Sequence, residues 1–190
     1  MTSVDDAFAA VPRAWFLPPD QVRFAAQDRA LPLGYGQTGS QPTTVRNMLL
    51  LLEVSPGHHV LDVGCGSAWT TALLAHLVGP TGSVQGVELV PELVDFGRAN
   101  LRRLNVSWVS VTAAEPGVLG LPASAPYDRI LVSAVAREVP RALVDQLRPG
   151  GVMVVPVAGR MAVVRRPEPP AADPDVVLHG HYAFVPLIEP

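Results

Sequence analysis

The sequence predicts an α/β protein with a doubly wound, mostly parallel β-sheet of the Rossmann-like type and a C-terminal antiparallel strand pair. An apolar run at 59–63 stops at a glycine-rich turn and leads into a helical pattern at 70–78. A second apolar run, 83–88, ends at Glu88, 26 residues after Asp62. Strands that alternate with helices in this way build a parallel sheet.

The other elements follow in chain order. Prolines and glycines interrupt residues 1–40 so often that we expect irregular structure there. Between 43 and 53, apolar residues recur at the three- and four-residue spacings of an amphipathic helix. Pro91 is well placed in the first turn of a further helix. The rest of the pattern predicts strands at 106–111, 129–133 and 152–157, a helix at 139–147 that ends before Pro149-Gly150-Gly151, and an antiparallel edge pair made by 161–165 and 182–188.

Composition restricts the function classes. With 190 residues, 48% of them hydrophobic, we expect one globular domain, 1–190. The net charge of −3 and the absence of lysine disfavour a nucleic-acid partner, which requires a basic face. The densest apolar run, 49–52, is far shorter than a membrane span, so we expect no membrane association. The single cysteine, Cys65, and the lack of a secretory leader favour a cytoplasmic location. We also expect a monomer.

The glycine turn predicts the cofactor. The dinucleotide fingerprint requires a third glycine where this chain has Trp69. Asp62 is expected to face the ligand, and a carboxylate there repels a pyrophosphate but attracts a cation. S-adenosylmethionine carries a sulfonium, an ammonium and a ribose, and it has no phosphate. Glu88 is placed to accept hydrogen bonds from the ribose hydroxyls. The pattern therefore favours S-adenosylmethionine, and a glycine turn without a ligand is the alternative.

Several motifs are similar to those of one family. They are Val11-Pro12-Arg13, Gly36-Gln37-Thr38-Gly39-Ser40-Gln41-Pro42, Leu61-Asp62-Val63-Gly64-x-Gly66-Ser67, Ser133-Ala134-x-Ala136 and Phe184-Val185-Pro186-Leu187. Together they resemble the protein-L-isoaspartate (D-aspartate) O-methyltransferase family nearly end to end. The resemblance implies a class I methyltransferase fold in which residues 1–42 form the substrate and active-site segment and 43–190 form the Rossmann-like core.

The resemblance also implies the reaction. S-adenosylmethionine would donate a methyl group to the free α-carboxylate of an isoaspartyl residue in a damaged protein or peptide, which is a repair reaction. Ser40 would lie at the centre of transfer and hold the carboxylate, although a serine before a helix is often only a cap. A carboxylate with a pKa of about 3.5–4 is already ionised at pH 7, so no general base is needed. We expect no metal. The expected cofactor-binding residues are Gln37, Thr38, Gly39, Asp62, Gly64, Cys65, Gly66, Ser67, Glu88, Leu89 and Glu115.

The chain departs from the family at several positions. Ala114-Glu115-Pro116-Gly117 stands where the family usually carries Gly-Asp-Gly, and Pro116 removes a backbone donor. Such departures leave two alternatives open: a specialised homologue that methylates a peptide carboxylate in a biosynthetic pathway, and a decayed protein that binds S-adenosylmethionine without turnover. A methyltransferase acting on a small molecule or nucleic acid is a third, disfavoured by the acidic net charge.

Overall fold

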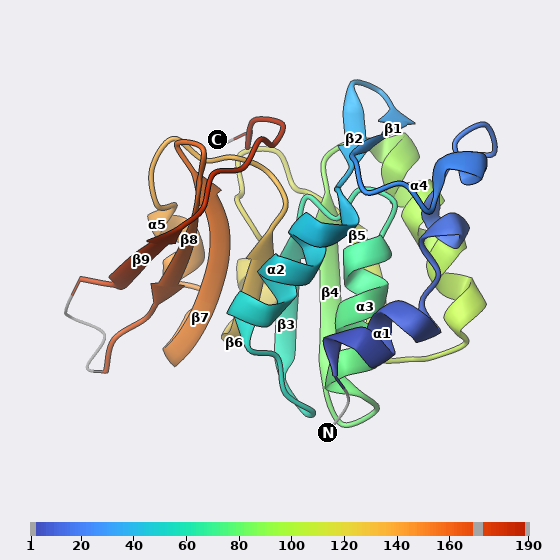
Figure 1. Ribbon diagram of the computed structural model, residues 1–190. Helices are drawn as coiled ribbons and strands as arrows, with labels where there is room; N and C mark the ends of the chain where they lie inside the picture. Colours follow the sequence, from blue (N-terminus) through green and yellow to red (C-terminus); the bar gives the residue numbers. More distant parts are fainter. Residues whose placement is uncertain (1–2, 169–172, 189–190) are drawn as a thin grey trace.

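A twisted β-sheet forms the centre of the molecule (Figure 1), seen here in a computed structural model that describes residues 3–168 and 173–188. Its strand order is β5-β4-β3-β6-β7-β8-β9. The strands are β3 His59–Val63, β4 Ser83–Glu88, β5 Val109–Ala113, β6 Tyr127–Val132, β7 Leu147–Val157, β8 Arg160–Arg165 and β9 Asp175–His179. Strands β3 to β7 are parallel to one another, whereas β8 pairs antiparallel with both of its neighbours, β7 and β9. The predicted doubly wound sheet with a C-terminal antiparallel pair is confirmed.

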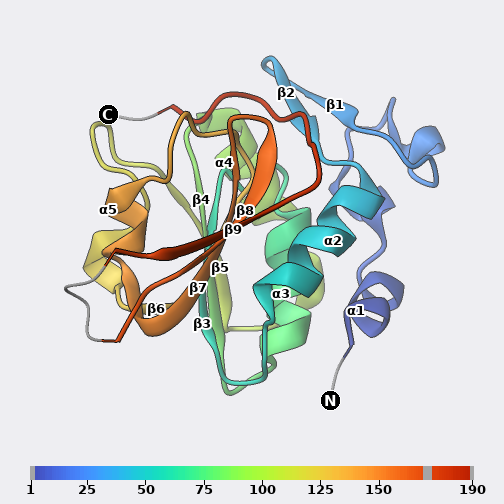
Figure 2. The ribbon, with the colours of Figure 1, turned by 60° about the vertical axis from the view of Figure 1, so that its left-hand side comes forward.

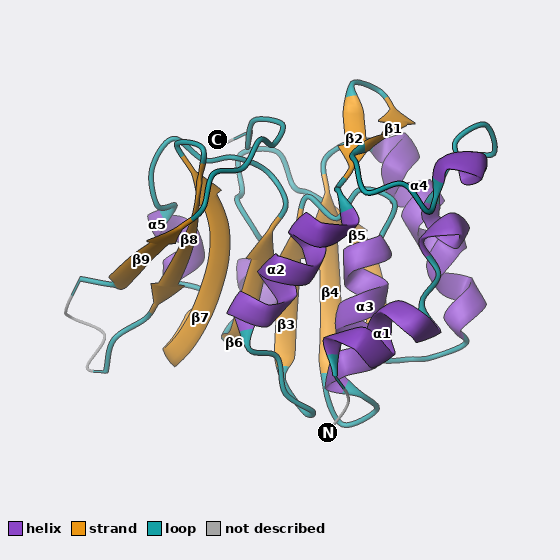
Figure 3. Ribbon diagram, viewed as in Figure 1, coloured by secondary structure: helices purple, strands orange, loops and turns teal. Residues whose placement is uncertain are grey.

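Helices cover both faces of the sheet. On one face lie α1 (Val4–Ala10), α2 (Pro42–Leu52) and α3 (Trp69–Val78), and α5 (Arg141–Val144) lies on the other (Figures 2 and 3). Helix α4 (Pro91–Leu101) packs into the same core as α3. Side chains of β3 alternate between the two cores: Val60 packs with α2 and α3, and Leu61 with α5. Among the described residues, no helix is both long enough and apolar enough to span a bilayer.

Local interactions explain where the helices begin. The Ser3 hydroxyl accepts the backbone N–H of Asp6 and the Asp6 carboxylate accepts that of Ser3, a reciprocal cap for α1. Helix α2 begins with Pro42, and its Thr43 N–H donates to the Asp28 carboxylate at 2.9 Å. A residue remote in sequence therefore caps α2, and this contact ties the preceding segment to the start of the helix.

The prediction of irregular structure for residues 1–40 is wrong in part. Besides α1, the segment contains short 3₁₀ turns at Arg13–Phe16 and Val22–Phe24, and a hairpin of β1 (Leu31–Gly34) and β2 (Gln37–Gly39). Tyr35 and Gly36, both with positive φ, form the hairpin turn. Further 3₁₀ turns at Arg102–Leu104 and Pro122–Ser124 interrupt later loops.

Several boundaries in the second half also differ from the prediction. Helix α5 ends at Val144, and β7 already begins at Leu147, so Pro149-Gly150-Gly151 lies within the strand. There Gly150 N–H donates to the Arg166 carbonyl and Arg166 N–H to the Gly151 carbonyl, which extends the pairing past the proline. Strand β5 begins three residues later than predicted, because Asn105 turns the chain in the left-handed conformation.

The predicted edge pair has one wrong member. Strand β8 pairs with β9, Asp175–His179, and not with residues 182–188. The segment from Tyr182 to Ile188 instead crosses the carboxyl end of the sheet, where Val135 N–H donates to the Val185 carbonyl and Leu187 N–H to the Val135 carbonyl, each at 2.8 Å. This crossing brings C-terminal residues to the end of the sheet at which ligands bind in open α/β folds.

Candidate functional site

A cavity of about 370 Å³ lies at the carboxyl ends of the parallel strands. It adjoins the point between β3 and β6 where the strand order reverses, the position at which doubly wound sheets bind ligands. The walls come from the β2 hairpin, the turns after β3, β4, β5 and β6, and the C-terminal segment. We call it the first cavity. Its volume is that of a small-molecule site.

Glu88 is fixed in the wall of the first cavity by backbone groups. Its Oε2 accepts the Gly66 N–H at 2.8 Å, and its Oε1 accepts the N–H groups of Leu89 at 2.8 Å and Val90 at 3.0 Å. The residue is only 7% exposed. A carboxylate offers about four acceptor positions, so one, on Oε2, remains for a ligand hydroxyl. The same bonds tie the end of β4 to the glycine turn after β3.

The glycine turn itself depends on close packing. Gly66 has φ +54°, a conformation that other residues rarely adopt, and a Cβ there would lie 3.2 Å from Leu33 Cδ1. Asn100 of α4 donates from Nδ2 to the Ser67 carbonyl at 3.1 Å, a buried bond. Burial raises the pKa of the Cys65 thiol well above its usual value. Cys65 is therefore a wall residue and not an activated nucleophile.

Asp62 does not face the first cavity, which corrects the sequence prediction. It is fully buried below the start of α3, where Oδ2 accepts the hydroxyls of Thr70 and Thr71 at 2.7 Å each. Its Oδ1 has no hydrogen-bond partner among the described residues. Burial raises the pKa of Asp62 to about 6. Thr70 lines the cavity and Asp62 does not, so the carboxylate lies behind the wall.

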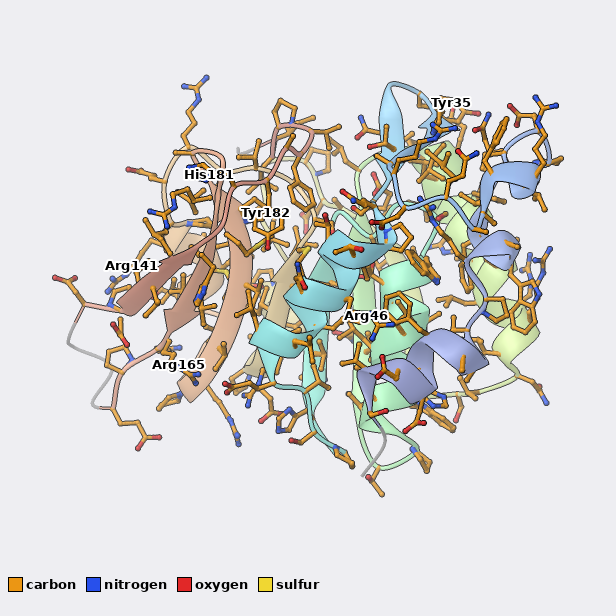
Figure 4. All side chains as sticks on the ribbon, in the orientation of Figure 1. Tyr35, Arg46, Arg141, Arg165, His181 and Tyr182 are labelled. Carbon is orange, nitrogen blue, oxygen red and sulfur yellow. The ribbon has the colours of Figure 1, made fainter. Side chains whose placement is uncertain are left out.

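A second cavity of about 390 Å³ adjoins the first. Hydroxyl and amide side chains of α2 and its preceding segment form one side, among them Thr43, Thr44 and Asn47. His181 and Tyr182 of the C-terminal segment form the other side, and the Tyr182 hydroxyl lies 3.4 Å from Asn47 Nδ2. Figure 4 shows Tyr182 on the C-terminal segment beside α2.

Four residues line both cavities: Thr38, Ser40, Ser133 and Val185. We call them the shared wall. Ser40 does not cap α2: the N-cap is Gln41, no side-chain cap is formed there, and Asp28 accepts the Thr43 N–H instead. The alternative interpretation of Ser40 as a helix cap is therefore wrong. Its backbone carbonyl accepts a hydrogen bond from Arg13 at 3.0 Å.

A sequence model of the protein-L-isoaspartate (D-aspartate) O-methyltransferase family matches residues 1–189. The chain belongs to this family.

Relatives and solved structures agree with that assignment. The chain is 44% identical over 191 residues to the protein-L-isoaspartate O-methyltransferase of Methanopyrus kandleri, covering 97% of this chain and 83% of that protein. It is 49% identical over 152 residues to the Aeropyrum pernix enzyme of the same name, covering 80% of this chain but only 58% of the relative. A solved protein-L-isoaspartate O-methyltransferase superposes with TM-score 0.85 at 25% identity, covering 98% of this chain and 62% of that one. A Plasmodium falciparum structure of that family, in complex with S-adenosyl-L-homocysteine, superposes with TM-score 0.83 at 22% identity, covering 98% and 90%.

Within this family member, every predicted site residue except Asp62 lines the first cavity. Glu115 lies exposed at its rim, in the Ala114–Gly117 segment, and Leu89 is 45% exposed. Their binding of a cofactor stays a prediction. Among the described residues, no cluster of His, Cys, Asp or Glu has the composition of a metal site.

Several residues of the first cavity were not predicted from the sequence. Arg13 lines it although only 7% exposed, and its guanidinium donates to four backbone carbonyls, those of Gln27, Arg29, Gly39 and Ser40. The Val11-Pro12-Arg13 motif contributes to the family resemblance, but it does not by itself predict a role for the arginine. Ser133 and the 185–188 segment lie in or beside motifs that resemble the family, but they were not predicted as site residues, because only the folded sheet brings them beside Ser40.

Proposed function

We propose that the protein is an S-adenosylmethionine-dependent carboxyl O-methyltransferase that repairs proteins or peptides by methylating the α-carboxylate of isoaspartyl residues. One observation carries the proposal: Ser40 belongs to the wall between two adjoining cavities. A methyl donor in the first cavity and an acceptor carboxylate in the second would meet at that wall. Family membership supports the same reaction.

The residues of the first cavity fit S-adenosylmethionine. Glu88 keeps one acceptor position for a ribose hydroxyl, and the apolar side chains of Leu33, Val63 and Trp69 provide a surface for the remainder of the ligand. When bound, S-adenosylmethionine supplies an electrophilic methyl group on a sulfonium. The glycine turn, held by Glu88 and Asn100, fixes the backbone that would contact the ligand.

The residues of the second cavity fit a peptide better than a nucleic acid. Its described lining contains hydroxyl and amide groups and the imidazole of His181, and neither arginine nor a carboxylate. Such a surface forms hydrogen bonds with peptide groups but lacks the cluster of basic side chains that neutralises phosphates. Ser40 would orient the acceptor carboxylate, and no residue has to remove a proton because the carboxylate is already ionised. Catalysis then comes from alignment and from exclusion of water.

We further propose that residues 1–42 and 43–190 act as a single domain, as a monomer in the cytoplasm. In support, both cavities combine residues of the two segments of one chain. The only cysteine is buried and cannot readily link two copies. Light scattering of the purified protein tests the oligomeric state.

The activity is tested by incubating the protein with methyl-labelled S-adenosylmethionine and a matched pair of peptides that differ only in an isoaspartyl or aspartyl linkage. We expect label on the isoaspartyl peptide and little on its partner. Equal labelling would contradict recognition of the isoaspartyl linkage. Binding of S-adenosylhomocysteine without any transfer would instead favour the decayed binding protein.

A further inference from the structure

Ser133 lies at the carboxyl end of the sheet. It follows β6 directly, at the strand-order reversal, and its N–H donates to the Val63 carbonyl of β3 at 2.9 Å. This bond fixes the residue at the carboxyl end of two neighbouring strands. Ser133 also belongs to the shared wall, together with Ser40, which lies on the segment after β2.

The Ser133 hydroxyl is buried and has no hydrogen-bond partner among the described residues. Buried polar atoms in folded proteins are nearly always partnered, so such an atom in a cavity wall points to a group supplied by a ligand. Two other buried polar atoms share this property, Arg13 Nε and Asp62 Oδ1. Neither residue lines both cavities, so Ser133 alone of the three belongs to the wall where the two cavities meet.

We propose that Ser133 is a further catalytic residue whose hydroxyl donates a hydrogen bond to the acceptor carboxylate, beside Ser40. The inference rests on the proposed function and deepens it. A carboxylate has two oxygens, and only one receives the methyl group. With one hydroxyl on each side, Ser40 orients the reacting oxygen and Ser133 holds the other.

This role affects substrate binding more than turnover. The hydrogen bond is strongest to the full negative charge of the free carboxylate. That charge disappears as the ester forms, so the interaction weakens towards the transition state. Loss of the hydroxyl therefore raises KM for the peptide and does not lower kcat.

The test compares Ser133→Ala with wild type on an isoaspartyl peptide, with Ser110→Ala, an exposed serine of β5, as the matched control. We expect Ser133→Ala to raise KM for the peptide about 10- to 100-fold, the usual loss for a hydrogen bond to a charged group. We expect kcat and S-adenosylhomocysteine affinity to stay within about threefold. The melting temperature should not fall, because the hydroxyl has no partner in the free protein.

The other possible results separate the role of Ser133 from the proposed function. An unchanged KM for Ser133→Ala, with wild type active, overturns the role of Ser133 and leaves the proposed function intact. A parallel loss of S-adenosylhomocysteine affinity also overturns it, because Ser133 would then serve the first cavity. If the alanine variant does not fold, Ser133→Cys, similar in shape but a weaker donor, must show the KM increase. Wild type that fails to methylate the peptide contradicts the proposed function itself.

Discussion

The Arg13 guanidinium donates a hydrogen bond to the backbone carbonyl of Ser40 at 3.0 Å. The same side chain bonds the carbonyls of Gln27, Arg29 and Gly39, and it lies 5.5 Å from the centre of the Trp69 ring. One buried cation therefore joins the loop after the second 3₁₀ turn, the segment that carries Ser40 and the start of α3. The position of Ser40 relative to the first cavity depends on this connection.

We expect Arg13→Lys to lower both stability and turnover. Lysine keeps the charge, but its single ammonium lacks the planar fork that reaches several carbonyls at once. Displacement of Ser40 should reduce kcat about 10- to 100-fold, since small misalignments of reacting groups are costly. Arg23→Lys, an exposed arginine on the same segment, is the control. Wild-type kcat in the folded Arg13→Lys protein would show that Arg13 does not position Ser40.

Ser40→Ala should lower kcat about 100-fold and leave the melting temperature nearly unchanged. The structure sharpens this expectation, because Asp28 and not Ser40 caps α2. Asp28→Ala is therefore the complementary variant, with a lowered melting temperature and near-normal turnover of the folded protein. Measuring kcat and melting temperature for both variants separates catalysis from capping. A Ser40→Ala protein with wild-type kcat would require the catalytic assignment to be withdrawn.

Glu88→Ala should weaken S-adenosylhomocysteine binding about 10- to 100-fold, which corresponds to about 1.5–3 kcal/mol for a lost charged hydrogen bond. Glu88→Gln should lose nearly as much affinity for S-adenosylhomocysteine. Its amide NH₂ group would face backbone N–H groups that now donate hydrogen bonds to the carboxylate. Glu92→Gln, in the first turn of α4, is the control. Calorimetry gives all three affinities. Tight binding by Glu88→Ala would show that the cofactor site lies elsewhere.

The pH dependence of stability should reveal the buried Asp62. Its pKa is raised from 3.8 to about 6, chiefly by burial. The folded protein therefore holds this proton more tightly than the unfolded chain. The contribution favours folding at low pH and is lost as the pH rises from about 4 to 6. Asp62→Asn cannot ionise, so its stability relative to wild type should increase across that interval by on the order of 1–3 kcal/mol. Urea unfolding of both proteins at pH 4, 5, 6 and 7.5 measures the difference. A difference that stays constant with pH would contradict the raised pKa.

Sequence patterns predicted the elements whose signals are local. Strands β3 and β4 have the predicted bounds, because each is a short apolar run stopped by a turn or an acidic residue. The placement of Glu88 in the first cavity followed from the same pattern. Asp62 was misplaced, since the spacing of the motif does not show that Thr70 and Thr71 cover its carboxylate.

Features set by contacts distant in sequence were not predictable in this way. Strand β9 was missed because four of its five residues are exposed, so no core-facing apolar pattern marks it, and pairing with β8 defines it. The shared wall combines residues 38, 40, 133 and 185, which come from three distant parts of the chain. Only the order of strands and the crossing of the C-terminal segment bring them together.

The chemical nature of the transferred group tests the central claim most directly. An isoaspartyl peptide labelled by the protein with methyl-labelled S-adenosylmethionine is exposed to mild alkali, and the volatile label is collected. Methylation of a carboxylate gives a base-labile ester, so we predict release of nearly all the label as methanol. Label that remains on the peptide would indicate methylation of nitrogen or a base-stable ether. That result would contradict methyl transfer to a carboxylate at the shared wall.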